Sequence, residues 1–192
     1  MAAEAIASAA PAAHEDRVRS LQIKRMGLWL FFISDSLLFA LLALTRFYLV
    51  GTETPEELSQ VLGLGVTSIL LLSSLTAFRA ETAIAHGNIA HAKRMLLATI
   101  ALGIIFVGGV TIEWSIAGFT LSEGYGTAFF TMTGMHVTHV VSGIVMLGLA
   151  YVLLRRGRFS MDNHWGLAAV VLYWHFVDVV WVFFYPTLYL VN

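Results

Sequence analysis

The chain has 192 residues, of which 58% are hydrophobic and 12% are charged, about half the charged share of an ordinary soluble domain. With a mean hydropathy of +0.80, this composition excludes a disordered chain and argues against a soluble globule. The formal net charge of −1 says little about partners, and no group of basic residues suggests nucleic acid. The absence of cysteine excludes disulfides, thiolate metal sites and cysteine nucleophiles.

The first 25 residues form an Ala-rich segment without the positive start and leucine-rich core of a secretory signal. We expect a frayed cytoplasmic tail on the membrane surface, or a segment that contacts a neighbouring subunit. A membrane-spanning helix needs about 20 mostly apolar residues. Five later stretches qualify, at about 26–50, 61–85, 95–114, 127–154 and 165–191. The sequence therefore predicts an all-α integral membrane protein, with five transmembrane helices in one bundle over residues 26–192.

Basic residues gather at alternate ends of these spans. They are Arg17, Arg19, Lys24 and Arg25, then Arg79, Lys93 and Arg94, then Arg155, Arg156 and Arg158. The other two connections, residues 51–60 and 116–126, carry acids and no Lys or Arg. The positive-inside rule then predicts a cytoplasmic N-terminus and a periplasmic C-terminus. Four of these arginines are candidates for contacts with anionic lipid head groups: Arg79, Arg155, Arg156 and Arg158.

Several ionisable side chains fall deep inside the predicted spans. They are Asp35 in the first span, His136 and His139 in the fourth, and His175 and Asp178 in the fifth. Such groups are costly at the bilayer centre unless they are paired or neutral. We therefore expect them to face one another or another protein, with His175 hydrogen-bonded to Asp178 three residues further along the same helix. Glu113 lies near the outer end of the third span, where we expect water to be close.

Three further interpretations of these residues remain open. His136, His139 and His175 could converge on a metal or haem, although their neighbours are bulky. Asp35 and Asp178 could line a proton or ion path, although no proline lies in the middle of a span as in many carriers. Small residues could instead form an interface with a larger membrane partner; these are Ser34, Ser36, Gly134, Ser142 and Gly143. An interface combined with a buried polar network accounts best for the residues.

Two other patterns have simpler interpretations. The Gly/Ser/Thr-rich stretch at residues 63–78 indicates close helix packing. Aromatic residues at the outer ends predict a belt at the membrane interface: Trp114, Tyr125, Tyr185 and Tyr189.

The motifs resemble those of subunit III of haem–copper terminal oxidases. "YWHFVDVVWVFFYP" at 173–186 resembles the signature of the family's last helix, and "TGMHVTHVVSG" at 133–143 its T-G-x-H-x-x-H-x-x-x-G motif. "IEWSIAGFTLSEGYGTAFF" at 112–130, "FSMDNHWG" at 159–166 and "LWLFFISDSLLFALL" at 28–42 are similar to further family segments in the same order. The resemblance covers nearly the whole chain.

The resemblance implies a subunit that packs on subunit I of a proton-pumping oxidase that reduces oxygen to water. Such a subunit binds no haem or copper itself, since these lie in partner subunits, and it supports proton uptake and sustained turnover. It also holds phospholipids, contacts other oxidase subunits and can join a respiratory supercomplex. The family's buried polar positions match Asp35, Glu113, His136, His139, His175, Asp178 and Trp181.

The chain also departs from longer relatives, which have seven helices, because its five spans lack the first two. The lipid-holding cleft of those relatives must then be absent or completed by another subunit. The acid of the first span, often Glu in the family, is Asp35 here. Cytochrome c is the favoured electron donor, and a quinol oxidase or the related subunit of nitric oxide reductases is the alternative. A stand-alone proton or ion carrier is the alternative from another class. The expected location is a bacterial inner membrane.

Overall fold

The computed structural model describes residues 2–52, 59–161 and 163–191, with side chains from Glu15 onward except that of Arg17. Most of the acidic first connection, residues 53–58, therefore lies outside the described residues, as does the side chain of Arg17. The chain divides into two compact units, Met1–Leu38 and Phe39–Asn192.

Five α-helices make up most of the chain, and each is long and apolar enough to cross a membrane. Their bounds are α1 Ala2–Val50, α2 Gln60–Ala85, α3 Ile89–Ile116, α4 Gly124–Arg155 and α5 Trp165–Tyr185, followed by a π-helix, Pro186–Leu190. The predicted all-α class with five spans is confirmed, and the residues that the structure describes contain no strand beyond one isolated bridge. Helix α1 begins at Ala2, where the sequence predicted a frayed tail. Alanine is the strongest helix former, which accounts for a helical backbone there.

Two of the interhelical turns follow from a glycine in the left-handed conformation. After α2, Gly87 has φ +74°, and the N–H of Asn88 donates to the carbonyl of Ala83. After α4, Gly157 has φ +69°, and the N–H of Arg158 donates to the carbonyl of Leu153. These bonds satisfy helix-end carbonyls in the Schellman pattern. Each turn therefore ends its helix sharply and lets the next helix return alongside.

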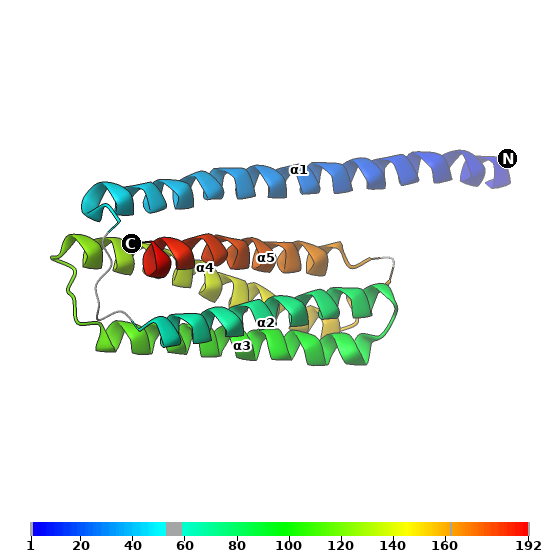
Figure 1. Ribbon diagram of the computed structural model, residues 1–192. Coiled ribbons are helices and arrows are strands. Elements are labelled where there is room, and N and C mark those ends of the chain that lie inside the picture. The colour runs from blue at the N-terminus through cyan, green and yellow to red at the C-terminus, as the bar shows by residue number, and fades with distance from the viewer. Residues whose placement is uncertain (1, 53–58, 162, 192) are drawn as a thin grey trace. The chain divides into compact units, whose positions relative to one another are not determined.

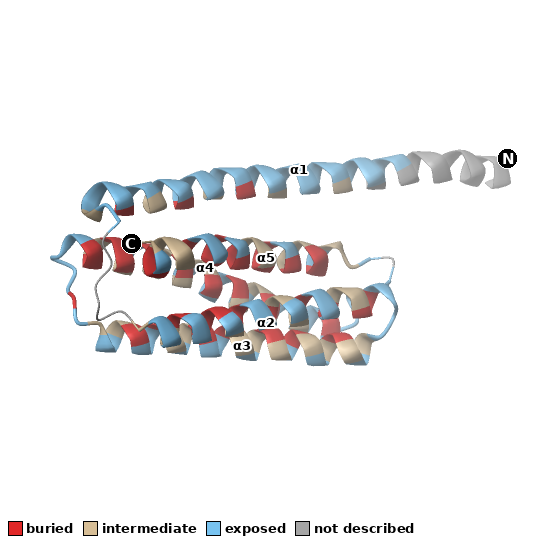
Figure 2. Cartoon of the chain, viewed as in Figure 1, coloured by how far each residue is buried: buried red, intermediate tan, exposed pale blue. Residues whose placement is uncertain are grey.

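Helices α2–α5 form a ring within the second unit, because α2 packs on α3 and α5, and α4 packs on the same two helices (Figure 1). Buried residues recur along each of the four helices (Figure 2). On α4 they include Phe129, His136 and Gly143, at heptad spacing. Large exposed apolar side chains cover the outward faces, as expected where lipid rather than water is the surrounding medium.

Two glycines make room for the indole of Trp174 in the middle of this ring. A Cβ atom at Gly103 of α3 would lie 2.7 Å from the Trp174 ring, and one at Gly143 of α4 would lie 2.8 Å from it. Because only glycine leaves this space, both helices approach the indole closely. Trp174 is 1% exposed and thereby joins three helices.

Replacing Gly143 with leucine should therefore overpack the centre of the bundle. We expect Gly143→Leu to lower stability by about 1–3 kcal/mol, measured by thermal unfolding of the purified protein. The matched control is Gly148→Leu in the same helix, where a Cβ would meet no atom within 4 Å. Equal losses in the two variants would show that the effect is not due to Trp174.

Candidate functional site: a buried polar network

Three tryptophans make the same hydrogen bond between helices. The indole N–H of Trp174 donates to Ser73 Oγ at 3.0 Å, and that of Trp181 donates to Thr67 Oγ1 at 2.9 Å. The indole N–H of Trp114 on α3 donates to Thr133 Oγ1 of α4 at 3.0 Å.

Each accepting hydroxyl in turn donates to a carbonyl of its own helix. A serine or threonine hydroxyl has one proton and two lone pairs, so it can do both at once. The predicted packing face at residues 63–78 thus also supplies the acceptors for two buried indoles.

Trp181 and His136 lie in an aromatic layer about two helical turns beyond Trp174. The ring of Phe106 is perpendicular to that of Trp181, with centroids 4.9 Å apart, and the rings of His136 and Trp181 are 4.7 Å apart. The edge-to-face contact between Phe106 and Trp181 adds to the energy of burial. Trp181, which the sequence placed in the polar network, is therefore held by α2 through its N–H and by α3 and α4 through its ring.

His136 is fully buried and bridges α4 to α5. Its Nε2 donates to the carbonyl of Val177 at 3.1 Å, because a carbonyl oxygen can only accept. That carbonyl already belongs to the α5 helix, so the bond uses its second lone pair. The other ring nitrogen, Nδ1, has no hydrogen bond from the described residues. His136 is therefore positioned as a helix-to-helix donor.

The predicted hydrogen bond between His175 and Asp178 is absent from the described structure. The Nδ1 of His175 lies 2.6 Å from Ser74 Oγ of α2 instead. Ser74 also lies near the Asp178 carboxyl, but within the described chain neither carboxyl oxygen has a bond of hydrogen-bonding geometry. The reason is that α2 presents a hydroxyl directly to the imidazole, and this hydroxyl is the hydrogen-bond partner of His175 Nδ1. Asp178 is 3% exposed, so it is a buried acid at the α2–α5 contact.

His139 occupies a different environment from His136. It is half-buried, its Nδ1 donates to the carbonyl of Met135 at 2.8 Å, and its ring lies 4.8 Å from that of Phe39. Ser142, one turn on, lies 2.6 Å from the hydroxyl of Tyr173. Ser142 and Gly143, expected at an interface with a partner, thus serve contacts between α4 and α5.

Glu113 is buried, contrary to the expectation that water lies close to it. It is 3% exposed, and its Oε2 accepts the hydroxyl proton of Tyr189 at 2.8 Å. The π-helix brings Tyr189 back over the end of α3, and Gly63 leaves room for its ring, because a Cβ there would lie 2.6 Å from that ring.

The predicted aromatic belt is wrong for two of its members. Tyr125 and Tyr189 are 5% and 0% exposed, and the Tyr125 hydroxyl donates to the carbonyl of Leu188 at 2.6 Å. These tyrosines close the end of the bundle from within.

Arg46 is a buried cation that the sequence reasoning missed. It is fully buried near the end of α1, and its guanidinium donates to the carbonyl of Gly51 and, at 3.4 Å, to that of Val191. It also lies 5.8 Å from the centre of the Tyr125 ring. The sequence held one sign that Arg46 is unusual. It lies near the predicted periplasmic ends of the spans, whereas all other Lys and Arg residues lie at the predicted cytoplasmic ends. Such a cation is best accommodated by internal carbonyl and aromatic partners.

The remaining predicted residues are Asp35 in the first compact unit and four exposed arginines in the second. Asp35 belongs to the first compact unit, in a part of α1 where Ser34 and Ser36 donate to carbonyls of their own helix. Arg79, Arg155, Arg156 and Arg158 are exposed at the opposite ends of α2 and α4 from the Tyr189 cluster. Over the ranges that the structure describes, no group of three His, Cys, Asp or Glu residues could hold a metal ion. His136, His139 and His175 instead make separate hydrogen bonds.

Removing one hydroxyl of the network should leave a buried indole donor without a partner. We expect Ser73→Ala to lower stability by about 1–3 kcal/mol, because the buried N–H of Trp174 loses its acceptor and no water can replace it. Thermal unfolding of the purified complex measures this. Ser68→Ala is the control, since Ser68 is exposed on the same helix and bonds only to its own Leu64 carbonyl. A loss in Ser68→Ala as large as that in Ser73→Ala would contradict the assignment.

Comparison with known proteins agrees with the motifs. The family model described as "Cytochrome c oxidase subunit III" matches residues 5–192. Cytochrome c oxidase subunit 3 of Neurospora crassa is 36% identical over 177 residues, covering 85% of this chain and 66% of the relative. The protein of the same name from Loxodonta africana is 35% identical over 178 residues, covering 86% and 68%. The chain thus aligns with about two thirds of the length of these relatives. A match over nearly all of its residues shows that the chain belongs to the cytochrome c oxidase subunit III family.

Proposed function

We propose that this chain is a non-catalytic core subunit of a proton-pumping haem–copper oxidase, packed on subunit I, which holds the haem and copper. The observation that carries the proposal is that residues of the family motifs form hydrogen bonds between helices of this chain. His136, Trp174 and Trp181 bond α5 to its neighbours. Polar groups engaged in this way build a rigid scaffold, and a rigid scaffold suits a subunit that supports a neighbouring catalyst.

The proposed role is to aid proton uptake by subunit I and to protect it during turnover. Cytochrome c is the favoured donor of the complex, since the similar proteins carry the name cytochrome c oxidase subunit 3. A quinol oxidase or a nitric oxide reductase partner is the alternative. The other proposed partners are further oxidase subunits, membrane phospholipids and a respiratory supercomplex.

The proposed setting is a bacterial inner membrane crossed five times, with the N-terminus cytoplasmic. The exposed Arg155, Arg156 and Arg158 cluster at the end of α4 supports this orientation. Arg46 at the other end is buried and engaged with carbonyls, so it does not weaken the charge asymmetry.

A stand-alone proton or ion carrier is the second candidate, favoured by one observation. Asp178 is buried, and the described chain gives its oxygens no hydrogen bond. A buried carboxyl group of this kind is available to accept and release a transported proton. Flux through the isolated chain in vesicles, abolished by Asp178→Asn, would establish this alternative.

The deciding experiment is a reduced-minus-oxidised optical spectrum of the complex purified gently through a tag on this chain. We expect haem bands together with oxygen consumption, and an assay with reduced cytochrome c or quinol on the same sample identifies the donor. An intact preparation without haem would overturn the proposal and direct attention to the flux assay.

A second prediction concerns the oxidase after this chain is removed. We expect activity to begin near the level of the complete complex and then to decay with successive turnovers, because the catalyst loses its supporting scaffold. Continuous oxygen-consumption recording on both preparations measures the decay. Turnover that stays constant without the chain would refute the supporting role.

A further inference from the structure

Tyr189 and Glu113 form a buried pair of a phenol and a carboxyl group. The Tyr189 hydroxyl donates to Oε2 of Glu113 at 2.8 Å, and the two residues are 0% and 3% exposed. The other carboxyl oxygen, Oε1, has no hydrogen bond from the described part of the chain. A carboxylate at this distance from a hydroxyl can take its proton directly. In this arrangement a tyrosine can lose an electron and its proton together.

Two other buried tyrosines bond to much weaker bases. The Tyr125 hydroxyl donates to the carbonyl of Leu188 at 2.6 Å, and the Tyr173 hydroxyl lies 2.6 Å from that of Ser142. A backbone carbonyl or an alcohol accepts a hydrogen bond but does not remove a phenolic proton. Tyr189 therefore differs from both in having a proton acceptor as its partner.

Trp181 lies beside this pair along the face of α2. Its indole N–H donates to Thr67 Oγ1, and a Cβ atom at Gly63 would lie 2.6 Å from the ring of Tyr189. Gly63 and Thr67 are one helical turn apart, so the two aromatic side chains meet α2 about 6 Å apart along its axis. Electron transfer between aromatic rings is fast over such short separations.

The charges of the two sites favour an electron moving from Tyr189 to an oxidised Trp181. An indole that loses one electron becomes a cation, and the Thr67 hydroxyl is too weak a base to remove its N–H proton. If Tyr189 supplies the electron and Glu113 takes the phenolic proton, the products are a neutral indole, a neutral tyrosyl radical and a neutral carboxylic acid. A buried cation and a buried anion disappear together, which is favourable where the dielectric constant is low.

A second buried cation offsets the cost of the negative charge on Glu113. Arg46 is 0% exposed, and both Arg46 and Glu113 lie near enough to Tyr125 to interact with it electrostatically. A positive charge at this end of the bundle compensates part of the desolvation of a carboxylate. Glu113 can therefore carry the charge that makes it a proton acceptor.

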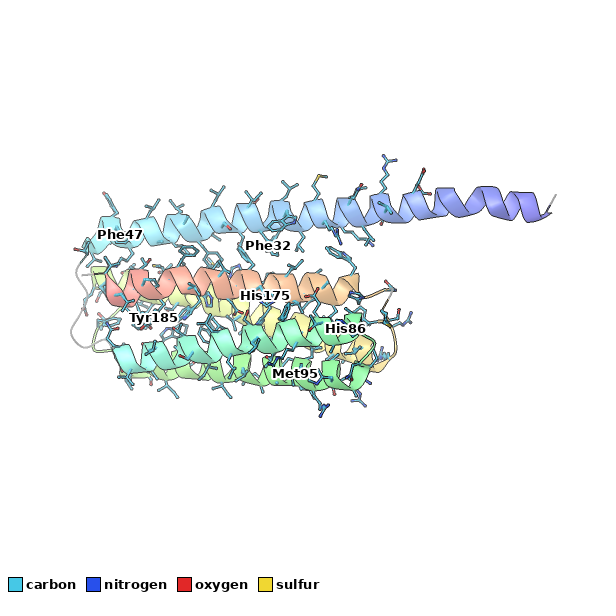
Figure 3. The ribbon with its side chains drawn as sticks, turned by 45° about the vertical axis from the view of Figure 1, so that its right-hand side comes forward. Phe32, Phe47, His86, Met95, His175 and Tyr185 are labelled. Carbon is cyan, nitrogen blue, oxygen red and sulfur yellow. The ribbon has the colours of Figure 1, made fainter. Side chains whose placement is uncertain are left out.

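Tyr185 connects Tyr189 to the surface of the protein. Their rings are stacked, with centroids 5.0 Å apart and planes at 24°, and Tyr185 is half-buried. Figure 3 shows Tyr185 near the end of the bundle, whereas His175 lies further along α5 towards the middle. A radical on Tyr189 is thus one ring away from a side chain that the surroundings can reach.

We propose that Tyr189 and Glu113 form a proton-coupled redox site, which reduces Trp181 after an oxygen-derived radical has oxidised it. The radical takes one electron from the indole and becomes its anion. Tyr189 then gives one electron to the indole and its hydroxyl proton to Glu113. A water-soluble one-electron reductant such as ascorbate restores Tyr189 through the stacked Tyr185, and Glu113 returns the proton. The inference goes beyond the proposed function, because every residue that it needs belongs to this chain.

The test forms tryptophan radicals in the purified full-length protein by ultraviolet flash photolysis. Transient absorption follows the tyrosyl radical that appears as the tryptophan radical decays, and electron paramagnetic resonance identifies it in samples frozen after the flash. We expect Tyr189→Phe to lose most of the tyrosyl signal. Glu113→Gln should lose it too, because an amide oxygen keeps the hydrogen bond but does not take the proton. Tyr173→Phe is the control, since it removes another buried tyrosine, and it should keep the signal.

Melting temperatures show whether each variant is folded, and Glu113→Gln tests the site without removing the tyrosine ring. A full signal in folded Tyr189→Phe would mean that another tyrosine is the electron donor, and a full signal in Glu113→Gln would mean that its carboxylate is not the proton acceptor. Equal loss in Tyr173→Phe, or no tyrosyl signal in the unchanged protein, would also overturn the inference. None of these measurements involves an oxidase partner, so failure here and failure of the oxidase proposal are distinguishable.

Discussion

The indole N–H groups of two buried tryptophans, Trp174 and Trp181, and of the half-buried Trp114 constrain this fold, because the interior of a bilayer offers them no water. Each one must find an acceptor within the protein or lose the free energy of a hydrogen bond. Ser73, Thr67 and Thr133 provide those acceptors from neighbouring helices. A hydrogen bond at a fixed position along each helix sets the register between α2 and α5 and between α3 and α4. Apolar packing alone sets register only weakly where lipid is as apolar as the core.

The same requirement explains why a histidine and an aspartate stand in the apolar run at residues 173–186. His175 meets the Ser74 hydroxyl of α2, just as Trp174 beside it meets Ser73. Two adjacent hydroxyls on α2 thus receive two adjacent side chains of α5. Asp178 lies next to this contact without a hydrogen bond from the described part of the chain, which distinguishes it from the satisfied groups around it. The run therefore contains both structural hydrogen bonds and one buried acid without such a partner.

The sequence predicts well how deep a residue lies in a membrane span, but it predicts poorly which neighbours its side chain meets around the helix. The five spans follow from hydropathy alone, and α2 and α4 begin and end within about three residues of the predicted limits, as expected for boundaries. Glu113 was placed correctly near a span end, but hydropathy could not show that the π-helix would bring Tyr189 over it. Tyr125 was misassigned to an interface belt for the same reason. The prediction of a His175–Asp178 hydrogen bond was wrong because spacing along one helix does not show which side chains the neighbouring helix presents. Here α2 presents the Ser74 hydroxyl to His175.

The family motifs thus act mainly within the chain. Residues of the last helix bond to α2 and α4, and Gly103 and Gly143 admit the ring of Trp174. Under the proposed function, partner subunits and lipids would then contact the outward faces, where large apolar side chains are exposed. A substitution in these motifs would therefore act on a neighbouring subunit through the rigidity of the bundle. If a motif substitution acts on oxidase activity in this way, the loss of activity would scale with the lost stability of the chain. A substitution that removes a direct contact with a neighbouring subunit would instead leave that stability intact.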